Sequence, residues 1–177
     1  MIISRNKRIG IFGGSFDPPH YGHLEISKQA IRKLSLDQIY WCITKKNPLK
    51  NKTFFPLSER IKKSRSITSK VKKIKIKLFE DKVKSTNTID LIKYLKKKSE
   101  KETLFLIIGS DNLIKFHKWK NWKNLLELTE IVVFSRKDFD KKAKKSVIVK
   151  HVKNIIYIKH KSINVSSTQI KKDYPKA

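Results

Sequence analysis

Residues 8–23 read RIGIFGGSFDPPHYGH, a short apolar run followed by two glycines and two histidines. The apolar run of residues 8–12 ends at Gly13 and Gly14, which predicts a buried strand that leads into a tight turn. Glycine has no side chain, so the backbone of such a turn can approach a ligand closely. The apolar positions within residues 22–34 predict a helix directly after the turn. This stretch therefore indicates the first strand–turn–helix unit of an α/β fold.

Two histidines stand where the predicted helix begins. His20 and His23 are three residues apart, so on a helical turn they share one face. The start of a helix also presents free backbone N–H groups and the positive end of the helix dipole. Imidazoles placed there can donate hydrogen bonds to the non-bridging oxygens of a polyphosphate. The alternatives are that the histidines only cap the turn, or bind a metal as a pair, although two histidines without a third ligand make a poor zinc site.

Strand and helix patterns alternate along the rest of the chain. Apolar runs predict strands at residues 38–43, 104–108, 130–134, 147–149 and 155–158. Alternation of apolar residues with lysine predicts a strand at residues 71–79 that exposes one face to solvent. Helical spacing predicts helices at residues 58–69, 88–98 and 119–128, and a further helix start at residues 166–172. This alternation predicts a parallel sheet with helices on both faces, and no linker or repeat divides it, so we expect one domain over residues 1–177. Ligands of such sheets bind beyond the carboxyl ends of the strands.

The chain is strongly basic, with 43 Lys and Arg residues against 15 Asp and Glu residues and a net charge of +28. Such a balance often indicates a polyanionic partner. Arginine supplies only six of the 43 cations, whereas nucleic-acid sites favour the bidentate fork of arginine. We therefore expect a compositionally biased surface, and a basic nucleic-acid-binding protein is kept as the alternative.

Two further features of the composition bear on the compartment. The sequence has no apolar stretch of the roughly 18 residues that a membrane span needs, so no membrane partner is expected. A single cysteine, Cys42, excludes an intramolecular disulfide framework, and the simplest compartment is a reducing cytoplasm.

Polar side chains follow two of the later predicted strands. Asn47 offers a hydrogen-bond donor and an acceptor after residues 38–43, and Lys50 in the same segment can meet a phosphate, although a polar surface loop would look similar. After residues 71–79, Thr88 or Thr86 could cap the next helix, or Thr88 could present its hydroxyl to an anion.

The strand at residues 104–108 is followed by Gly109 and Asp111, and a carboxylate in that position can accept hydrogen bonds from sugar hydroxyls. Among the aromatic residues just beyond, Trp119 is expected to stack on a flat ring, whereas Phe116 and Trp122 are expected in the core. His117 is expected to be structural.

Two more segments offer groups for a nucleotide. Arg136 follows the predicted strand at residues 130–134 and could stack on a base or meet a phosphate. Ser167 and Thr168 stand at a predicted helix start, where hydroxyls are either ordinary caps or part of an anion site.

The motif GGSFDPPHYGH resembles the signature of the HxGH nucleotidylyltransferase superfamily, whose fold is Rossmann-like. Further along, the stretches NPLK, TNTID, GSDNL with FHKWKNW, VVFSR and NVSSTQIK resemble, in this order, motifs of bacterial nicotinate-nucleotide adenylyltransferases. The resemblance implies adenylyl transfer from ATP to nicotinate mononucleotide, giving deamido-NAD and pyrophosphate, with Mg²⁺ bound to ATP. Sister enzymes that act on nicotinamide mononucleotide or phosphopantetheine are the alternatives within the superfamily.

The resemblance also assigns expected roles. His20 and His23 are the expected catalytic residues, and the nicotinate mononucleotide is expected at Asn47, Thr88 and Trp119. ATP and its phosphates are expected at Gly13, Gly14, Ser15, Phe16, Lys50, Gly109, Asp111, Arg136, Ser167, Thr168 and Lys171. No protein side chains are expected to form a dedicated metal site. The chain departs from the family at Lys171, where arginine is usual, and at its end, where relatives usually continue into a further helix.

Overall fold

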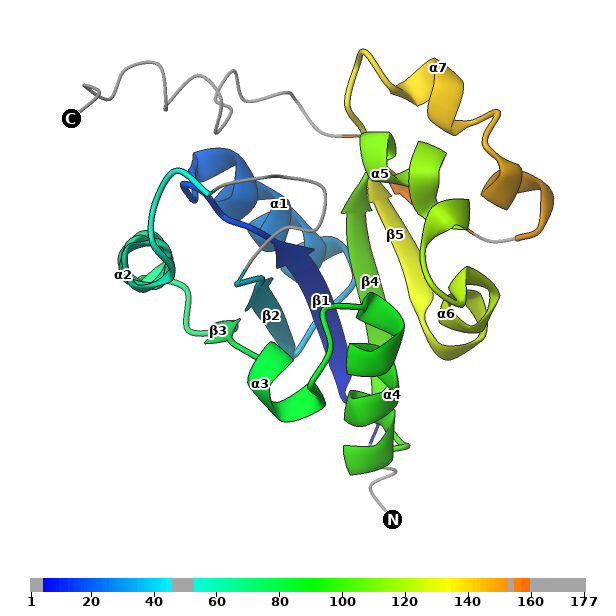
Figure 1. Ribbon diagram of the computed structural model, residues 1–177. Coiled ribbons are helices and arrows are strands. Elements are labelled where there is room, and N and C mark those ends of the chain that lie inside the picture. The colour runs from blue at the N-terminus through cyan, green and yellow to red at the C-terminus, as the bar shows by residue number, and fades with distance from the viewer. Residues whose placement is uncertain (1–4, 46–52, 153–154, 160–177) are drawn as a thin grey trace.

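The computed structural model describes residues 5–45, 53–152 and 155–159. Its centre is a six-stranded sheet in the order β3-β2-β1-β4-β5-β6, and all neighbouring strands are parallel (Figure 1). The strands are β1 (Arg8–Gly14), β2 (Gln38–Ile43), β3 (Ile74–Lys77), β4 (Thr103–Gly109), β5 (Glu130–Phe134) and β6 (Ile156–Ile158). The strand order reverses between β1 and β4, so the crevice where such sheets bind ligands lies beyond these two strands.

Helices connect the strands and cover both faces of the sheet. They are α1 (Tyr21–Lys33), α2 (Leu57–Thr68), α3 (Glu80–Val83), α4 (Thr88–Lys98), α5 (Ser110–Lys115), α6 (Trp122–Leu128) and α7 (Asp140–Ala143). Two 3₁₀ turns, η1 (Phe116–Lys118) and η2 (Val147–Lys150), complete the described elements. The predicted α/β sheet with helices on both faces is thereby confirmed.

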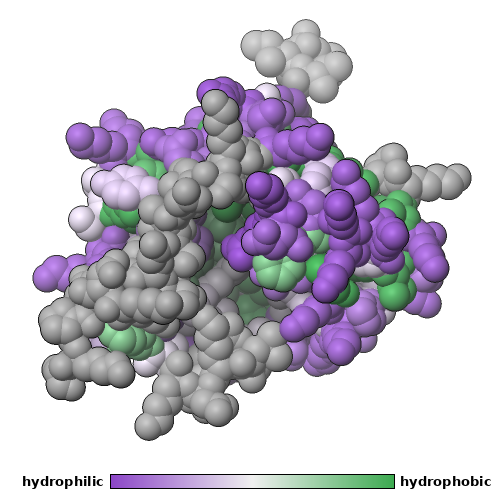
Figure 2. Space-filling model, turned by 90° about the horizontal axis from the view of Figure 1, so that it is seen from above, coloured by the Kyte–Doolittle hydropathy of each residue, from purple (hydrophilic) through white to green (hydrophobic). Residues whose placement is uncertain are grey.

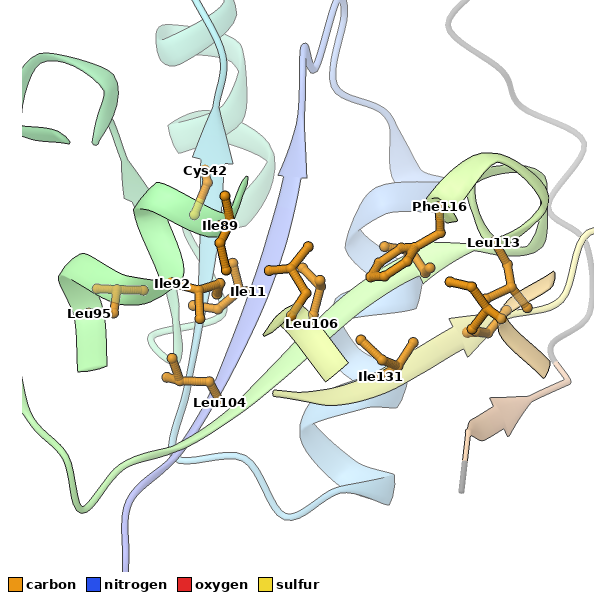
Figure 3. Packing of buried hydrophobic residues seen from close by; sticks show 14 of the residues in the cluster. Ile11, Cys42, Ile89, Ile92, Leu95, Leu104, Leu106, Leu113, Phe116 and Ile131 are labelled. Carbon is orange, nitrogen blue, oxygen red and sulfur yellow. The ribbon is translucent and has the colours of Figure 1, made fainter. Parts of the chain in front are cut away.

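Each face of the sheet has its own apolar core, because the central strands are apolar on both sides. One core packs Ile11, Leu106 and Ile131 against α4 and against the segment from α5 to η1 (Figure 3). The other core packs Ile39, Trp41 and Ile107 against α1 and α2. The two cores hold the carboxyl ends of β1, β4 and β5 in fixed relative positions.

Three predicted elements differ from the structure. The predicted helix at residues 119–128 begins only at Trp122, because Trp119 is extended after η1 and Asn121 has a φ of 48°. The predicted strand at residues 147–149 is the 3₁₀ turn η2, in which only Ile148 is buried. The strand predicted at residues 71–79 is shorter in the structure, where only the four residues of β3 form it.

The helix start predicted at residues 166–172, and the expected lack of a helix after it, lie outside the described residues. The prediction of one domain over residues 1–177 therefore stays a prediction. In the part of the chain that the structure describes, no helix is both long and apolar enough to cross a membrane.

The two outer strands of the sheet are short. β3 has four residues, two of which are Lys75 and Lys77, and β6 has three residues. Both edges therefore offer few free backbone groups.

Candidate active site

The loops after β1, β4 and β5 meet at one edge of the sheet. Figure 2 looks onto the side toward which the strands of Figure 1 point, and it shows a hollow with apolar residues in its floor and hydrophilic residues along one side of it. Of the predicted site residues, Gly13, Gly109 and Arg136 lie at or just beyond the carboxyl ends of β1, β4 and β5.

The loop after β1 differs in one respect from the sequence prediction. Neither Gly13 nor Gly14 has a positive φ; the left-handed residue of the loop is Phe16, with a φ of 45°. A Cβ at Gly13 would meet no atom of the described residues within 4 Å, so this glycine leaves open space at the end of β1. The lack of a side chain at Gly13 therefore leaves room for a ligand to approach the backbone, and the turn does not require glycine at this position.

Phe16 contributes to the core rather than offering its side chain to a nucleotide. Its ring is 2% exposed and stacks on Trp41 with 4.6 Å between ring centroids. The expected contact of Phe16 with ATP stays a prediction, and because the ring is buried such a contact would be made by the backbone.

His20 and His23 cap the start of α1 reciprocally. The Gly22 N–H donates to Nδ1 of His20 at 3.1 Å, and the His20 N–H donates to Nδ1 of His23 at 3.2 Å. Because Nδ1 accepts a hydrogen bond in both rings, the single proton of each neutral ring is on Nε2. The capping role and the predicted phosphate role are thus compatible, since the cap uses Nδ1 and leaves an Nε2–H donor.

Both histidines are neutral at pH 7. Burial, aided by the charge of Arg136, lowers the pKa of His20 to about 4. Burial also lowers the pKa of His23, and the neighbouring His20 and Arg136 lower it further. The two rings lie 3.8 Å apart between centroids, so they present their Nε2–H groups from one place. Neutral donors that are already oriented suit a site that stabilises developing negative charge.

Gly109, Asp111 and Arg136 form a second group of site residues at the ends of β4 and β5. Arg136 Nη1 donates to Asp111 Oδ2 at 3.3 Å, while Oδ1 of Asp111 is buried and has no hydrogen-bond partner among the described residues. A Cβ at Gly109 would lie 2.4 Å from that Oδ1 and 3.0 Å from Nε of Arg136. Glycine at position 109 is therefore required for the Asp111 carboxylate to lie where it does.

The backbone of Arg136 is held by residues that the sequence analysis did not select. Its N–H donates to Ser110 Oγ at 2.9 Å and to Asp140 Oδ1 at 3.0 Å. The Tyr157 hydroxyl donates to the same Asp140 oxygen at 2.5 Å, and burial, together with this carboxylate, raises the pKa of Tyr157 to about 12. Tyr157 therefore stays a donor, and Arg136 is fixed from β6 as well as from α7.

Thr88 is the first residue of α4 and does not cap it, which rules out the capping alternative. The N-cap is Asn87, whose side chain makes no capping bond and donates instead to Ser85 and Asp90. The half-buried Thr88 side chain is therefore not used as a helix cap.

Trp119 and Thr88 belong to neighbouring segments. Lys120 Nζ lies 3.4 Å from Asp90 Oδ2, which links the turn after η1 to the first turn of α4. The half-buried Trp119 ring stacks on the buried Phe116 ring with centroids 4.8 Å apart. Phe116 is in the core as predicted, and Trp122 packs against the same core. Trp119 is supported on one side, as a ring that stacks on a substrate requires.

Five predicted site residues lie outside the described residues: Asn47, Lys50, Ser167, Thr168 and Lys171. Their expected roles remain predictions. A hollow of about 470 Å³ adjoins the described end of the first of these segments, and it is lined by Lys45, Glu80, Asp81, Lys84, Ser85, Thr86 and Asn87.

Two buried charged residues near the site were not found by sequence reasoning. Asp17 is 1% exposed and accepts hydrogen bonds from the N–H groups of Phe54 and Phe55, both at 2.8 Å. Arg60 is also 1% exposed, and among the described residues its side chain donates to backbone carbonyls alone. The one available signal was that Arg60, Ser64 and Thr68 repeat at four-residue spacing on α2.

Comparison with known proteins shows the protein family to which the chain belongs. The family model described as cytidylyltransferase-like matches residues 11–173, which include both histidines and the ends of all the strands described above. The chain belongs to this family and, within it, to the nicotinate-nucleotide adenylyltransferases. A probable nicotinate-nucleotide adenylyltransferase of Pelagibacter ubique (strain HTCC1062) is 47% identical over 173 residues, which cover 97% of this chain and 96% of the relative. A probable nicotinate-nucleotide adenylyltransferase of Ruegeria sp. (strain TM1040) is 36% identical over 72% of this chain and 67% of its own length.

A solved structure confirms the fold. Nicotinic acid mononucleotide adenylyltransferase of Plasmodium falciparum, complexed with NaAD, superimposes with a TM-score of 0.78 over 94% of this chain and 83% of that chain. At 22% sequence identity this likeness concerns the fold alone. The Rossmann-like nucleotidylyltransferase fold expected from the sequence is therefore confirmed.

Proposed function

We propose that this chain transfers the adenylyl group of ATP to nicotinate mononucleotide, giving deamido-NAD and pyrophosphate in NAD biosynthesis. The observation that carries the proposal is the pair of neutral, oriented histidines beside the Asp111–Arg136 pair, at the reversal of strand order. Its substrate pair is supported by family membership, since a relative with 47% identity carries the name of this enzyme.

The chemistry needs no protein nucleophile. A 5′-phosphate oxygen of nicotinate mononucleotide attacks the α-phosphorus of ATP in line, the new P–O bond forms, and the bond to the β-phosphate oxygen breaks. Pyrophosphate takes the electron pair of the broken bond. Catalysis then consists of positioning and stabilisation of charge on the α-phosphate. His20 and His23 would donate their Nε2–H groups to the non-bridging oxygens of that phosphate.

The adenosine side is proposed at the ends of β1, β4 and β5. The open space above Gly13 lets the backbone of residues 13–16 approach phosphates. Oδ1 of Asp111, which has no hydrogen-bond partner among the described residues, is proposed to accept from a ribose hydroxyl, and Arg136 has an exposed guanidinium for the base or a phosphate. Lys50, Ser167, Thr168 and Lys171 are proposed for the remaining phosphate contacts.

The nicotinate side is proposed between the start of α4 and the turn after η1. Thr88 and the first N–H groups of α4 favour an anion, which in this substrate is the pyridine carboxylate. Trp119, stacked on Phe116, would cover the pyridine ring. Asn47 is proposed as a further polar contact. This pocket is what would separate the acid mononucleotide from the amide, because only the acid carries the carboxylate.

Mg²⁺ is proposed to accompany ATP. Within the described residues no group of three His, Cys, Asp or Glu side chains could hold a metal ion, and Oδ1 of Asp111 is a single oxygen without a partner. Such a donor set fits an ion that keeps waters and is bound mainly by substrate phosphates. When bound, the ion would neutralise charge on the β- and γ-phosphates, while the transfer step itself rests on the groups above.

We also propose that the chain acts in a reducing cytoplasm and has no nucleic-acid partner. Cys42 is a buried free thiol whose pKa is raised by burial to about 12, which is compatible with a reducing compartment. The basic surface would attract anionic substrates without a specific nucleic-acid site.

Pyrophosphate release tests the proposal. The enzyme is incubated with ATP and Mg²⁺ and, in parallel, with nicotinate mononucleotide, nicotinamide mononucleotide, phosphopantetheine or no acceptor. We expect release with the first acceptor to exceed the others by at least tenfold, since loss of a charged hydrogen bond costs about 1.5–3 kcal/mol. Preference for another acceptor would contradict the pocket at Thr88 and Trp119. Absence of release with every acceptor would contradict the enzyme activity itself.

A further inference from the structure

Arg60 connects three backbone segments next to the proposed active site. Its Nη1 donates to the carbonyl of Ser15 at 2.7 Å and to that of Thr44 at 2.8 Å. Its Nη2 donates to the carbonyl of Lys45 at 2.9 Å, and its Nε to that of Phe55 at 3.2 Å. One guanidinium thus satisfies four carbonyls that come from three separate stretches of chain.

These stretches surround the site. Ser15 belongs to the loop between β1 and α1, which leads to His20. Thr44 and Lys45 directly follow β2, and Phe55 directly precedes α2. The connection from β2 to α2 includes the predicted substrate residues Asn47 and Lys50, so Arg60 holds the described chain on both sides of residues 46–52.

Asp17 reinforces the same junction from the opposite side. Its carboxylate belongs to the β1–α1 loop and accepts both N–H groups of Phe54 and Phe55. Carbonyl groups are bound by Arg60 and N–H groups by Asp17, so the segment before α2 is fixed to the β1–α1 loop by hydrogen bonds of both kinds.

The four carbonyls around residue 60 require an arginine side chain at this position. A guanidinium has five N–H donors in a rigid fork, whereas the ammonium of lysine has three donors at one point. Four carbonyls in different directions match the fork. In the described part of the chain Arg60 has no ion-pair partner within 4 Å, so its charge is compensated by carbonyl dipoles and by the more distant Asp17 and Glu80 carboxylates.

We propose that Arg60 is a positioning residue for adenylyl transfer, which fixes the loop leading to His20 relative to both sides of the β2–α2 connection. The proposal rests on the proposed function for its activity readout. Arg60 does not touch the reacting atoms; it acts through the backbone of Ser15, Thr44, Lys45 and Phe55.

The test compares Arg60→Met and Arg60→Lys with Arg65→Met, an exposed control on the same helix. kcat and KM for ATP and nicotinate mononucleotide are measured at a temperature at which circular dichroism shows each variant to be folded. Misplacement by about 1 Å can lower turnover roughly 10²-fold, so we expect a loss of that order for Arg60→Met. We expect a smaller loss for Arg60→Lys and values within twofold of wild type for Arg65→Met.

Hydrogen–deuterium exchange supplies a readout that does not depend on activity. The N–H groups of Phe54 and Phe55 bind Asp17 and not Arg60, so they report the junction indirectly. We expect them to exchange at least tenfold faster in Arg60→Met, while N–H groups of β4 keep their wild-type rates. Uniformly faster exchange across the sheet would indicate a purely structural role and overturn the proposal.

The outcomes separate the two proposals. A folded Arg60→Met enzyme with wild-type kcat and KM would overturn the positioning role while leaving the proposed function intact. An inactive wild-type enzyme would remove the proposed function, and exchange at Phe54 and Phe55 would still decide whether Arg60 fixes the junction. If Arg60→Met does not fold, the same two measurements on Arg60→Lys decide.

Discussion

His23 has two separable roles, and asparagine and glutamine can distinguish them. The His20 N–H donates to Nδ1 of His23 at 3.2 Å, and this bond leaves Nε2–H as the donor that is proposed to meet a phosphate. The Oδ1 of asparagine lies near the position of Nδ1, so His23→Asn keeps an acceptor for the cap but removes the Nε2–H donor. His23→Gln places an amide N–H near the position of Nε2 and loses the cap acceptor.

The magnitudes of the two effects differ. Loss of a donor to developing charge costs about 2.7–4 kcal/mol, or about 10²–10³ in kcat, whereas loss of a helix cap costs about 1 kcal/mol of stability. We expect His23→Asn to lose 10²–10³ in kcat with little change in the free energy of unfolding. His23→Gln is expected to be faster than His23→Asn and less stable by about 1 kcal/mol.

Steady-state pyrophosphate release and urea unfolding measure the two quantities on the same preparations. A His23→Asn enzyme within twofold of wild-type kcat would refute the donor role of Nε2–H. A His23→Gln enzyme that is slower than His23→Asn would refute the division of roles between the two ring nitrogens.

Three further predictions concern the site. Burial lowers the pKa of His20 to about 4, below its ordinary value near 6.5, so the unfolded chain binds the proton first as the pH falls. We therefore expect the free energy of unfolding to drop between pH 6.5 and pH 4, by at most about 1.4 kcal/mol per pH unit for this group. Urea unfolding of His20→Asn should show a smaller dependence on pH. In Gly109→Ala the new Cβ would lie 2.4 Å from Oδ1 of Asp111, so the carboxylate must rotate. We expect the free energy of unfolding to fall by about 1–3 kcal/mol and the KM for ATP to rise. An unchanged KM for ATP would argue against Asp111 as a nucleotide ligand. Trp119→Ala should raise the KM for nicotinate mononucleotide more than that for ATP, and an equal rise in both would indicate a packing role.

The sequence predicts the central strands well because they are buried on both faces. The apolar residues of the runs at residues 104–108 and 130–134 are buried on both sides of the sheet, and these runs form β4 and β5. The strand predicted at residues 147–149 does not form, because a strand needs a neighbouring strand to pair with, and β6 already pairs with the edge of β5. Val147 and Val149 are 42% and 39% exposed.

The site was predictable where one short segment carries the chemistry. His20 and His23 share a helix turn, so their spacing alone places them together. Arg60 and Asp17 were not predictable, because the groups that they bind are backbone carbonyls and N–H groups of segments up to 45 residues away. A pattern of side chains does not show where such backbone groups gather.

The short outer strands have a consequence for how copies of this chain behave at high concentration. A free strand edge is a template for pairing with another molecule, and lysine side chains and short length are two ways in which proteins prevent this. Four residues with two lysines at one edge, and three residues at the other, provide little for an incoming strand to pair with. Lys75 and Lys77, which have no proposed part in the chemistry of the crevice, therefore help to keep a further strand from adding to the sheet at β3.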